Sequence, residues 1–173
     1  FLVERAIFAE FSERFVAQAR ALNPGDPLLA TTTLAPMARR DQRELLHAQV
    51  EDARALGANV LCGGVLPTGS GYFYPATVIT GPTPKMRLFC EEVFGPVAVL
   101  YEVADAGEAV GMANNSPFGL GASIWTRDIA RGRLLARALE CGVVCVNEVV
   151  KSDPSLPFGG VKQSGFGREL GKA

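Results

Sequence analysis

Short apolar segments of strand length alternate with amphipathic segments along most of this chain, and this alternation limits the folds open to it. The apolar segments are Asn59–Cys62, Ala76–Ile79, Val97–Val103, Ala122–Trp125 and Val143–Val146. Strands of nearly continuous apolar residues that are separated by helices favour a mostly parallel sheet with both faces covered. We therefore expect an α/β fold with three layers, α/β/α.

Apolar residues at three- and four-residue intervals predict the helices between these strands. The predicted helices cover residues 3–22, 37–56, 105–114 and 128–138. Asp105, with Glu108 three residues later, resembles a capping box, and Asp128 is placed to cap the last of these helices. From Asn147 onward, Pro and Gly residues predict loops.

Length and charge exclude several classes of protein. The 173 residues suit one domain, and a net charge of −1 gives no basic field for nucleic acid. No apolar run approaches the roughly 20 residues of a membrane-spanning helix, so we expect no membrane segment. Because the sequence begins with Phe1 and lacks the order of a signal peptide, we expect it to be part of a longer protein.

The cysteines and the histidine provide no standard metal site. The four cysteines form no Cys-x-x-Cys pair, and His47 is the only histidine. These spacings suit neither zinc nor haem, so we expect no metal. Too few cysteines are present for a disulfide scaffold, which favours a reducing, cytoplasmic setting. His47 is interpreted as a surface residue, since polar residues flank it on its predicted helix.

The segment Cys90–Pro96 carries two adjacent carboxylates, an aromatic ring and a Gly-Pro turn before a strand. A carboxylate accepts two hydrogen bonds at once, which suits a vicinal diol such as a ribose, and a nearby ring packs against a planar heterocycle. The alternative is a solvated acidic loop with Phe94 in the core. The residue types alone favour this alternative.

Two further segments are rich in glycine. Asn114–Gly121 is interpreted as a turn, because Ile124 stands where a dinucleotide fingerprint would have its third glycine. Pro157–Gly171 has the glycine density of a loop that folds tightly over a pocket, with Phe158 as one apolar wall. The alternative for this last segment is an ordinary surface loop.

In this order and spacing, five segments resemble the C-terminal part of the catalytic domain of NAD(P)-dependent aldehyde dehydrogenases. They are Glu91–Pro96 (Glu-Glu-x-Phe-Gly-Pro), Asn114–Leu120 (Asn-x-x-x-Phe-Gly-Leu), Gly142–Asn147 (Gly-Val-Val-x-Val-Asn), Pro157–Glu169 (Pro-Phe-Gly-Gly-x-Lys-x-Ser-Gly-x-Gly-Arg-Glu) and Gly71–Val78. The resemblance extends over essentially all 173 residues. It implies the aldehyde dehydrogenase type of catalytic domain, incomplete at both ends.

The resemblance implies that a cysteine thiolate attacks an aldehyde, a hydride passes to NAD or NADP, and water hydrolyses the thioester. Glu92 would bind the nicotinamide ribose, Phe94 would pack beside the ring, and Phe158 would line the substrate tunnel. The family's nucleophilic cysteine, general-base glutamate and cofactor-binding domain have no counterpart in the sequence, and neither has its C-terminal oligomerisation strand. We therefore expect residues 1–173 to be inactive alone and the parent enzyme to be a homo-oligomer, a dimer or tetramer.

Ser152 bears on the substrate, a small-molecule aldehyde. A serine at this position resembles succinate-semialdehyde dehydrogenases, in which its hydroxyl would donate a hydrogen bond to a substrate carboxylate. Alternatively, Ser152 caps a turn with Asp153. An amino-aldehyde or broad aliphatic dehydrogenase, and a non-catalytic domain that binds other subunits, remain the other interpretations of the chain.

Overall fold

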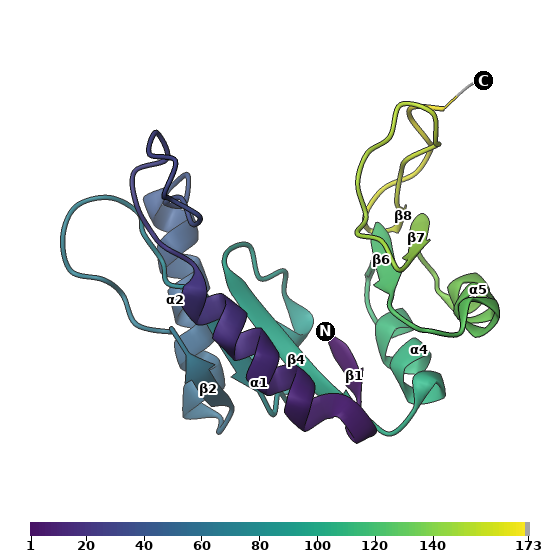
Figure 1. The fold of residues 1–173 in the computed structure, drawn as a ribbon, viewed down its shortest axis with the longest axis horizontal. Coiled ribbons are helices and arrows are strands. Elements are labelled where there is room, and N and C mark those ends of the chain that lie inside the picture. The colour runs from purple at the N-terminus through teal and green to yellow at the C-terminus, as the bar shows by residue number, and fades with distance from the viewer. Residues whose placement is uncertain (172–173) are drawn as a thin grey trace. The chain divides into compact units, whose positions relative to one another are not determined.

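The computed structural model describes residues 1–171, which form two compact units. The first unit is Phe1–Val103, and the second begins at Ala104 (Figure 1). The elements of the first unit are β1 (Leu2–Glu4), α1 (Arg5–Ala21), α2 (Arg40–Ala55), β2 (Asn59–Cys62), β3 (Thr77–Thr80), α3 (Arg87–Cys90) and β4 (Val97–Val103). Each unit is described by itself.

The first unit contains a four-stranded sheet in the order β1-β4-β3-β2. Strands β1 and β3 run parallel to β4, as the sequence predicts for most of the sheet. Strand β2 runs antiparallel to β3, with Asn59 opposite Thr80. This strand thus departs from the parallel arrangement predicted for most of the sheet. The reason is that the segment joining β2 and β3 contains no helix: a loop suffices to join antiparallel neighbours, whereas parallel neighbours require a crossover.

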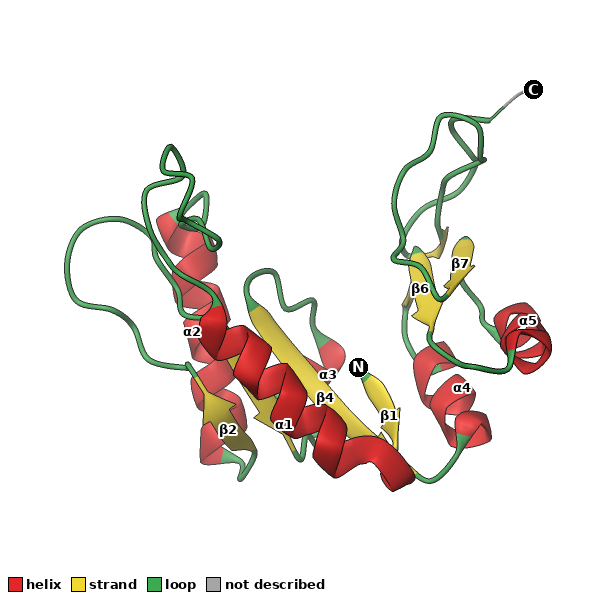
Figure 2. Ribbon diagram, viewed as in Figure 1, coloured by secondary structure: helices red, strands yellow, loops and turns green. Residues whose placement is uncertain are grey.

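Helices α1 and α2 cover opposite faces of this sheet, so the first unit has the predicted three layers (Figure 2). Ile79 and Val99, which are partners in the β3–β4 register, pack into the core with Leu46 of α2. Because side chains alternate along a strand, Val78 and Leu100 point to the other face, and both are fully buried. Helix α1 contacts all four strands.

The start of the first helix was predicted wrongly. Val3 lies in β1, where it is buried and pairs with Glu102 of β4, and α1 begins only at Arg5. The apolar period of three to four residues continues across this boundary, while the strand is fixed by pairing with residues almost a hundred positions away. The short helix α3 was not predicted either, because four residues carry too little periodicity.

The second unit is built around the parallel pair β6–β7. Its elements are α4 (Ala106–Asn114), β5 (Phe118–Gly119), β6 (Gly121–Ile124), α5 (Ile129–Ala138), β7 (Val143–Val146) and β8 (Val161–Lys162). Both predicted caps are confirmed: Asp105 accepts hydrogen bonds from the main-chain N–H groups of Gly107 and Glu108, and Asp128 accepts one from Arg131. The short antiparallel pair β5–β8 was expected to be loop.

Asn147 fixes the ends of β6 and β7. It has a left-handed backbone with φ of 57°, and its main-chain N–H donates to the carbonyl of Ile124 at 2.7 Å. Its side chain accepts from the N–H of Thr126 and donates to the carbonyl of the same residue, both at 2.8 Å. Asn tolerates this backbone conformation better than most residues, so this polar residue holds the chain as it leaves the strand.

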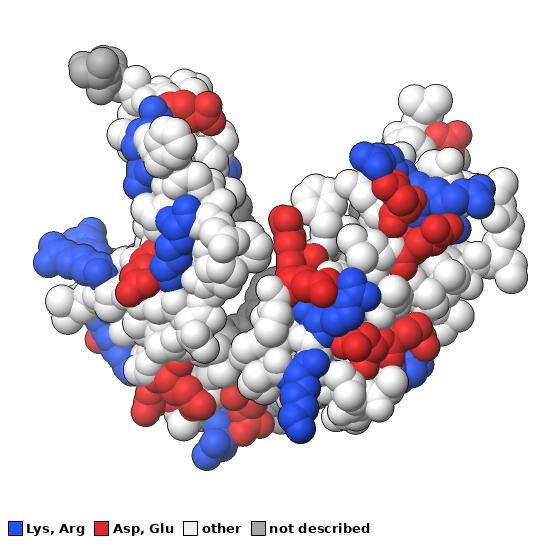
Figure 3. All heavy atoms as spheres, turned by 180° about the vertical axis from the view of Figure 1, so that it is seen from behind, with Lys and Arg blue, Asp and Glu red and all other residues white. Residues whose placement is uncertain are grey.

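Charged side chains of both signs lie beside one another over the face drawn in Figure 3. This distribution agrees with the net charge of −1. Among the helices of residues 1–171, none combines the length and apolar character required to cross a bilayer.

Candidate functional site

Residues Glu91–Gly95 connect α3 to β4, and Glu91 at the start of this segment has an extended backbone. Val93 packs against the core cluster that includes Leu46. Glu91 accepts a hydrogen bond from Gln49, a residue of α2 that is only 1% exposed. Glu91 and Val93 are thus held to the body of the unit, and Glu92 and Phe94 are exposed.

Glu91 is held by a polar network. Nε of Arg87 donates to Oε1 of Glu91 and Nη2 of Arg87 donates to Oε2, each at 2.9 Å. Nε2 of Gln49 also donates to Oε2 at 2.9 Å. The hydrogen bonds from Arg87 and then from Gln49 lower the pKa of Glu91, since they stabilise its ionised form. Both oxygens of the Glu91 carboxylate are therefore occupied by hydrogen bonds within the protein.

Glu92 and Phe94 are free to meet a ligand. Phe94 is 63% exposed, so the interpretation that placed it in the core is wrong. Glu92 is exposed, and no hydrogen bond or ion pair within residues 1–171 involves its carboxylate. A carboxylate with both oxygens available suits a vicinal diol, and an exposed ring beside it suits a planar heterocycle. These residues therefore fit the ribose and the ring of a nicotinamide cofactor.

Gly95 ends the loop where the backbone passes close to the core. A Cβ atom added at this residue would lie 2.4 Å from Cδ2 of Leu46 and 3.2 Å from Cε of Met37. Beyond it, the carbonyl of Pro96 accepts a hydrogen bond from Thr77 of β3 at 2.9 Å. The Gly-Pro pair thus fixes where the acidic loop enters β4.

Ser152 lies in the second unit, in the segment after β7. Its side chain is exposed, and within the described residues its hydroxyl has no hydrogen-bond partner. The nearby turn is capped by Asp153, whose Oδ1 accepts from the main-chain N–H and the hydroxyl of Ser155 at 2.8 and 2.6 Å. These hydrogen bonds lower the pKa of Asp153. The interpretation that Ser152 caps this turn is therefore wrong.

Phe158 is half-buried at the start of the glycine-rich loop. It forms a two-way main-chain pair with Glu169, in which each N–H donates to the other's carbonyl at 2.8 Å. A Cβ atom on Gly142 would lie 1.6 Å from the carbonyl oxygen of Gly159, so β7 begins in direct backbone contact with this loop. The loop therefore folds back on itself and holds Phe158 in place.

Lys162 holds the same loop to the rest of the second unit. Its Nζ donates to the carbonyl oxygens of Asn114 and Ser116 at 2.7 and 3.2 Å, and forms an ion pair with Glu140 at 2.8 Å. No role was predicted for Lys162, or for Gln49 and Arg87 in the first unit. For Gln49 a signal was available, because it shares the apolar face of α2 with Leu46 and Val50.

His47 differs from its predicted place on an exposed face. It is half-buried, and its Nδ1 lies 3.2 Å from the hydroxyl of Tyr74, which is only 1% exposed. Burial first, and then the charge of Glu51, raise the pKa of Tyr74 to about 12. Among residues 1–171, no group of three or more His, Cys, Asp or Glu side chains is arranged to hold a metal.

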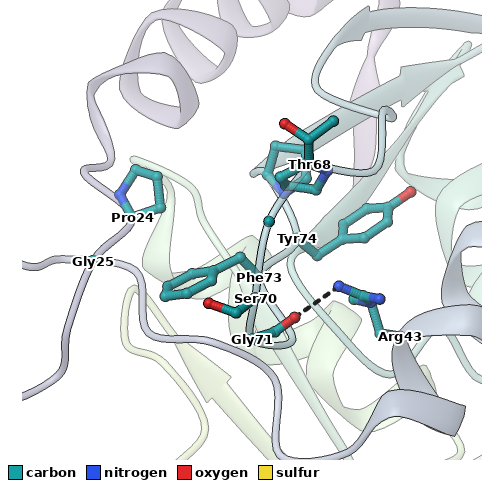
Figure 4. Close-up of a pocket in the computed structure, with 11 residues that line it drawn as sticks. Pro24, Gly25, Arg43, Thr68, Ser70, Gly71, Phe73 and Tyr74 are labelled. Atoms are coloured by element: carbon teal, nitrogen blue, oxygen red, sulfur yellow. Dashed lines mark hydrogen bonds between the residues drawn. The ribbon is translucent and has the colours of Figure 1, made fainter.

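A pocket of about 240 Å³ lies in the first unit beside the loop that precedes β3 (Figure 4). Its walls include Pro24, Phe73 and Tyr74, and Arg43 of α2 donates to the carbonyl of Gly71 at 2.9 Å. This hydrogen bond ties the loop to α2. None of the four predicted site residues lines this pocket.

The family model for the aldehyde dehydrogenase family matches residues 1–173. The chain is 50% identical over 170 residues to "Succinate semialdehyde dehydrogenase [NAD(P)+] Sad" of Escherichia coli K12, covering 98% of this chain and 37% of that relative. Among solved structures, succinic semialdehyde dehydrogenase from Streptococcus pyogenes, in complex with NADP+, superposes with a TM-score of 0.95 at 34% identity, covering 99% of this chain and 38% of that one.

Betaine aldehyde dehydrogenase from Staphylococcus aureus, in complex with NAD+, superposes with a TM-score of 0.94 at 33% identity, covering 99% of this chain and 35% of the other. The chain thus spans little more than a third of the length of these relatives. The likeness confirms the predicted fold class and the resemblance stated from the motifs. The chain belongs to the aldehyde dehydrogenase family.

Proposed function

We propose that this chain is the part of an NAD(P)-dependent aldehyde dehydrogenase that presents Glu92 and Phe94 to the cofactor and Ser152 and Phe158 to the aldehyde. The observation that carries the proposal is the unpartnered, exposed carboxylate of Glu92 beside the exposed ring of Phe94, on a loop fixed to the core from both ends. Residues 1–173 form one partial catalytic domain in this proposal.

When bound beside Glu92 and Phe94, NAD or NADP would supply the acceptor for the hydride of the aldehyde. Glu92 accepts hydrogen bonds from the two ribose hydroxyls and so orients the cofactor, while Phe94 limits the movement of the ring beside it. Neither residue exchanges protons with the substrate. Their contribution is therefore to place the cofactor for the reaction.

The nucleophilic cysteine of the proposed thioester lies outside this chain. In support, the thiols of Cys62, Cys90 and Cys141 donate to main-chain carbonyl oxygens of Ala76, Pro84 and Val143. Burial also raises the pKa of Cys141, which disfavours the thiolate that the reaction requires. Residues 1–173 alone are therefore inactive in this proposal.

The substrate is succinate semialdehyde, because the free hydroxyl of Ser152 is suited to donate to the carboxylate at the far end of that molecule. The 50% identity to a succinate semialdehyde dehydrogenase supports this choice. The second candidate is an amino-aldehyde, which the likeness to betaine aldehyde dehydrogenase favours. The enzyme is a cytoplasmic homo-oligomer in this proposal, and the four free cysteines among residues 1–171 agree with a reducing compartment.

The test uses the full-length protein, meaning the whole polypeptide encoded by the reading frame to which this chain belongs. Its intact mass is measured first, and NAD(P)H formation is then followed with succinate semialdehyde, an amino-aldehyde and an apolar aldehyde. We expect a mass well above 18.4 kDa and the highest kcat/KM with succinate semialdehyde. Preference for the amino-aldehyde would favour the second candidate, and a folded protein without turnover would favour a non-catalytic domain.

A further inference from the structure

We propose that Gln49 is a positioning residue for the cofactor, acting through the main chain of Glu92. This inference rests on the proposed function. Gln49 lies on α2 among the buried residues of that helix and is 1% exposed. Its Nε2 donates to the carbonyl oxygen of Glu92 at 3.1 Å as well as to Oε2 of Glu91 at 2.9 Å. One buried amide group therefore holds both residues of the acidic pair.

Burying a polar amide costs free energy unless it is hydrogen-bonded, so an apolar residue would serve better if Gln49 only filled space. Its neighbours on the same helix face, Leu46 and Val50, are apolar and equally buried. What the amide adds is direction, because it fixes the carbonyl group that is bonded to the Cα of Glu92. The side chain of Glu92 then leaves the loop toward solvent in a restricted range of directions.

The anchor extends to α3. Asp52 of α2 accepts a hydrogen bond from the N–H of Arg87 at 2.9 Å, at the start of that short helix. The side chain of Arg87 in turn holds Glu91 with two hydrogen bonds. Helix α2 therefore fixes the acidic loop Glu91–Gly95 at two places. Asp52 binds the beginning of α3, which precedes the loop, and Gln49 binds the main chain of Glu92.

A looser loop would cost cofactor affinity, because the carboxylate of Glu92 would have to be ordered when the ribose binds. Gln49→Leu removes the hydrogen bonds and keeps a buried side chain of similar length. Val50→Ala is the matched control, since Val50 is the next residue of α2, is also 1% exposed and contributes to the same core without a hydrogen bond to the acidic loop.

The experiment measures two quantities in the full-length wild type and both variants. The first is amide hydrogen exchange of a peptide covering residues 90–95. The second is the dissociation constant for NADH or NADPH, whichever the wild type binds more tightly, followed by the fluorescence of the reduced cofactor. For Gln49→Leu we expect faster exchange in this peptide and a dissociation constant about tenfold higher, the loss expected for one to two hydrogen bonds. For Val50→Ala we expect lower stability with both quantities near the wild-type values.

A further variant distinguishes a positioning role of Gln49 from a general loss of stability. In the Glu92→Gln background, Gln49→Leu should raise the dissociation constant much less, because the group that it positions has been altered. Unchanged exchange at residues 90–95 in Gln49→Leu, or an equal loss of affinity in Val50→Ala, would overturn the inference. A wild type that binds neither NADH nor NADPH would overturn the proposed function itself, and the exchange data would still show whether Gln49 holds the loop.

Discussion

The ammonium group of Lys162 lies 2.7 Å from the carbonyl oxygen of Asn114, and this contact joins the glycine-rich loop to the end of α4. The side chain of Asn114 in turn donates to Ala138 and accepts from Glu140, both at 2.8 Å, at the end of α5. Lys162 therefore binds the segment that begins with Phe158 to the end of α4, and Asn114 links this contact to the end of α5. Its substitution should affect folding more than an exposed charge would.

Replacing Lys162 with Met should lower the free energy of unfolding by about 2 to 3 kcal/mol, because two carbonyl oxygens lose a charged donor. Glu140→Gln should cost less than about 1 kcal/mol, since the side chain of Glu140 is 61% exposed and its ion pair is screened. Urea unfolding of both variants measures the difference. Equal losses would show that the ion pair, and not the carbonyl contacts, accounts for the stabilisation.

Gly142→Ala should lower the free energy of unfolding by about 3 kcal/mol or more, since the added Cβ meets backbone atoms of Gly159 that have no room to move. Gly111→Ala is the control in the same unit, because its Cβ would meet nothing within 4 Å. It should raise stability by about 0.5 to 1 kcal/mol, as Ala favours the helix. Thermal unfolding should show a lower melting temperature for Gly142→Ala and a higher one for Gly111→Ala. An unchanged melting temperature in Gly142→Ala would contradict the close contact between Gly142 and Gly159.

The stability of the protein should fall between about pH 10 and 12 through Tyr74, whose pKa is raised to about 12. In this range the unfolded chain has lost the phenol proton and the folded protein retains it, so raising the pH favours unfolding. Below about pH 10 the contribution is fully present. In Tyr74→Phe the free energy of unfolding should decrease by about 2 to 3 kcal/mol less than in the wild type over this pH range. Urea unfolding at several pH values measures both decreases. Identical pH profiles would contradict the burial of this hydroxyl.

Ser152→Ala in the full-length protein should raise the KM for succinate semialdehyde by about tenfold and change that for an apolar aldehyde by less than about twofold. The reason is that a hydrogen bond to a charged group contributes roughly 1.5 kcal/mol or more, and only the acid offers one. Steady-state kinetics of the wild type and the variant with both aldehydes gives the change in KM for each substrate. If both KM values rise together, Ser152 does not recognise the carboxylate.

The sequence predicted the longer elements well for a physical reason. Strands Asn59–Cys62 and Val97–Val103 have the bounds that were predicted, because each is an apolar run with Gly or Pro at a boundary. The strands that were missed, such as Leu2–Glu4 and Val161–Lys162, have two or three residues. They are strands only because distant segments pair with them, and local periodicity carries no sign of such pairing.

The ligand contacts of the candidate site stay predictions. The motif pointed to Glu92 and Phe94, and the structure exposes both. The role of Gln49 was not foreseen, because its partner Glu91 lies 42 positions away and only the packing of α2 brings them together. Residue types thus suggest which side chains to test for ligand binding, while contacts such as that of Gln49 emerge only from tertiary structure.

The most direct test of the central claim is the initial rate of NAD(P)H formation by the full-length protein and its Glu92→Gln variant, at limiting and saturating cofactor. The claim predicts turnover of succinate semialdehyde by the wild type and a cofactor KM about tenfold higher in the variant, since an amide accepts fewer hydrogen bonds from a diol than a carboxylate. Equal cofactor KM values, or a folded wild type that forms no NAD(P)H with any aldehyde, would contradict it.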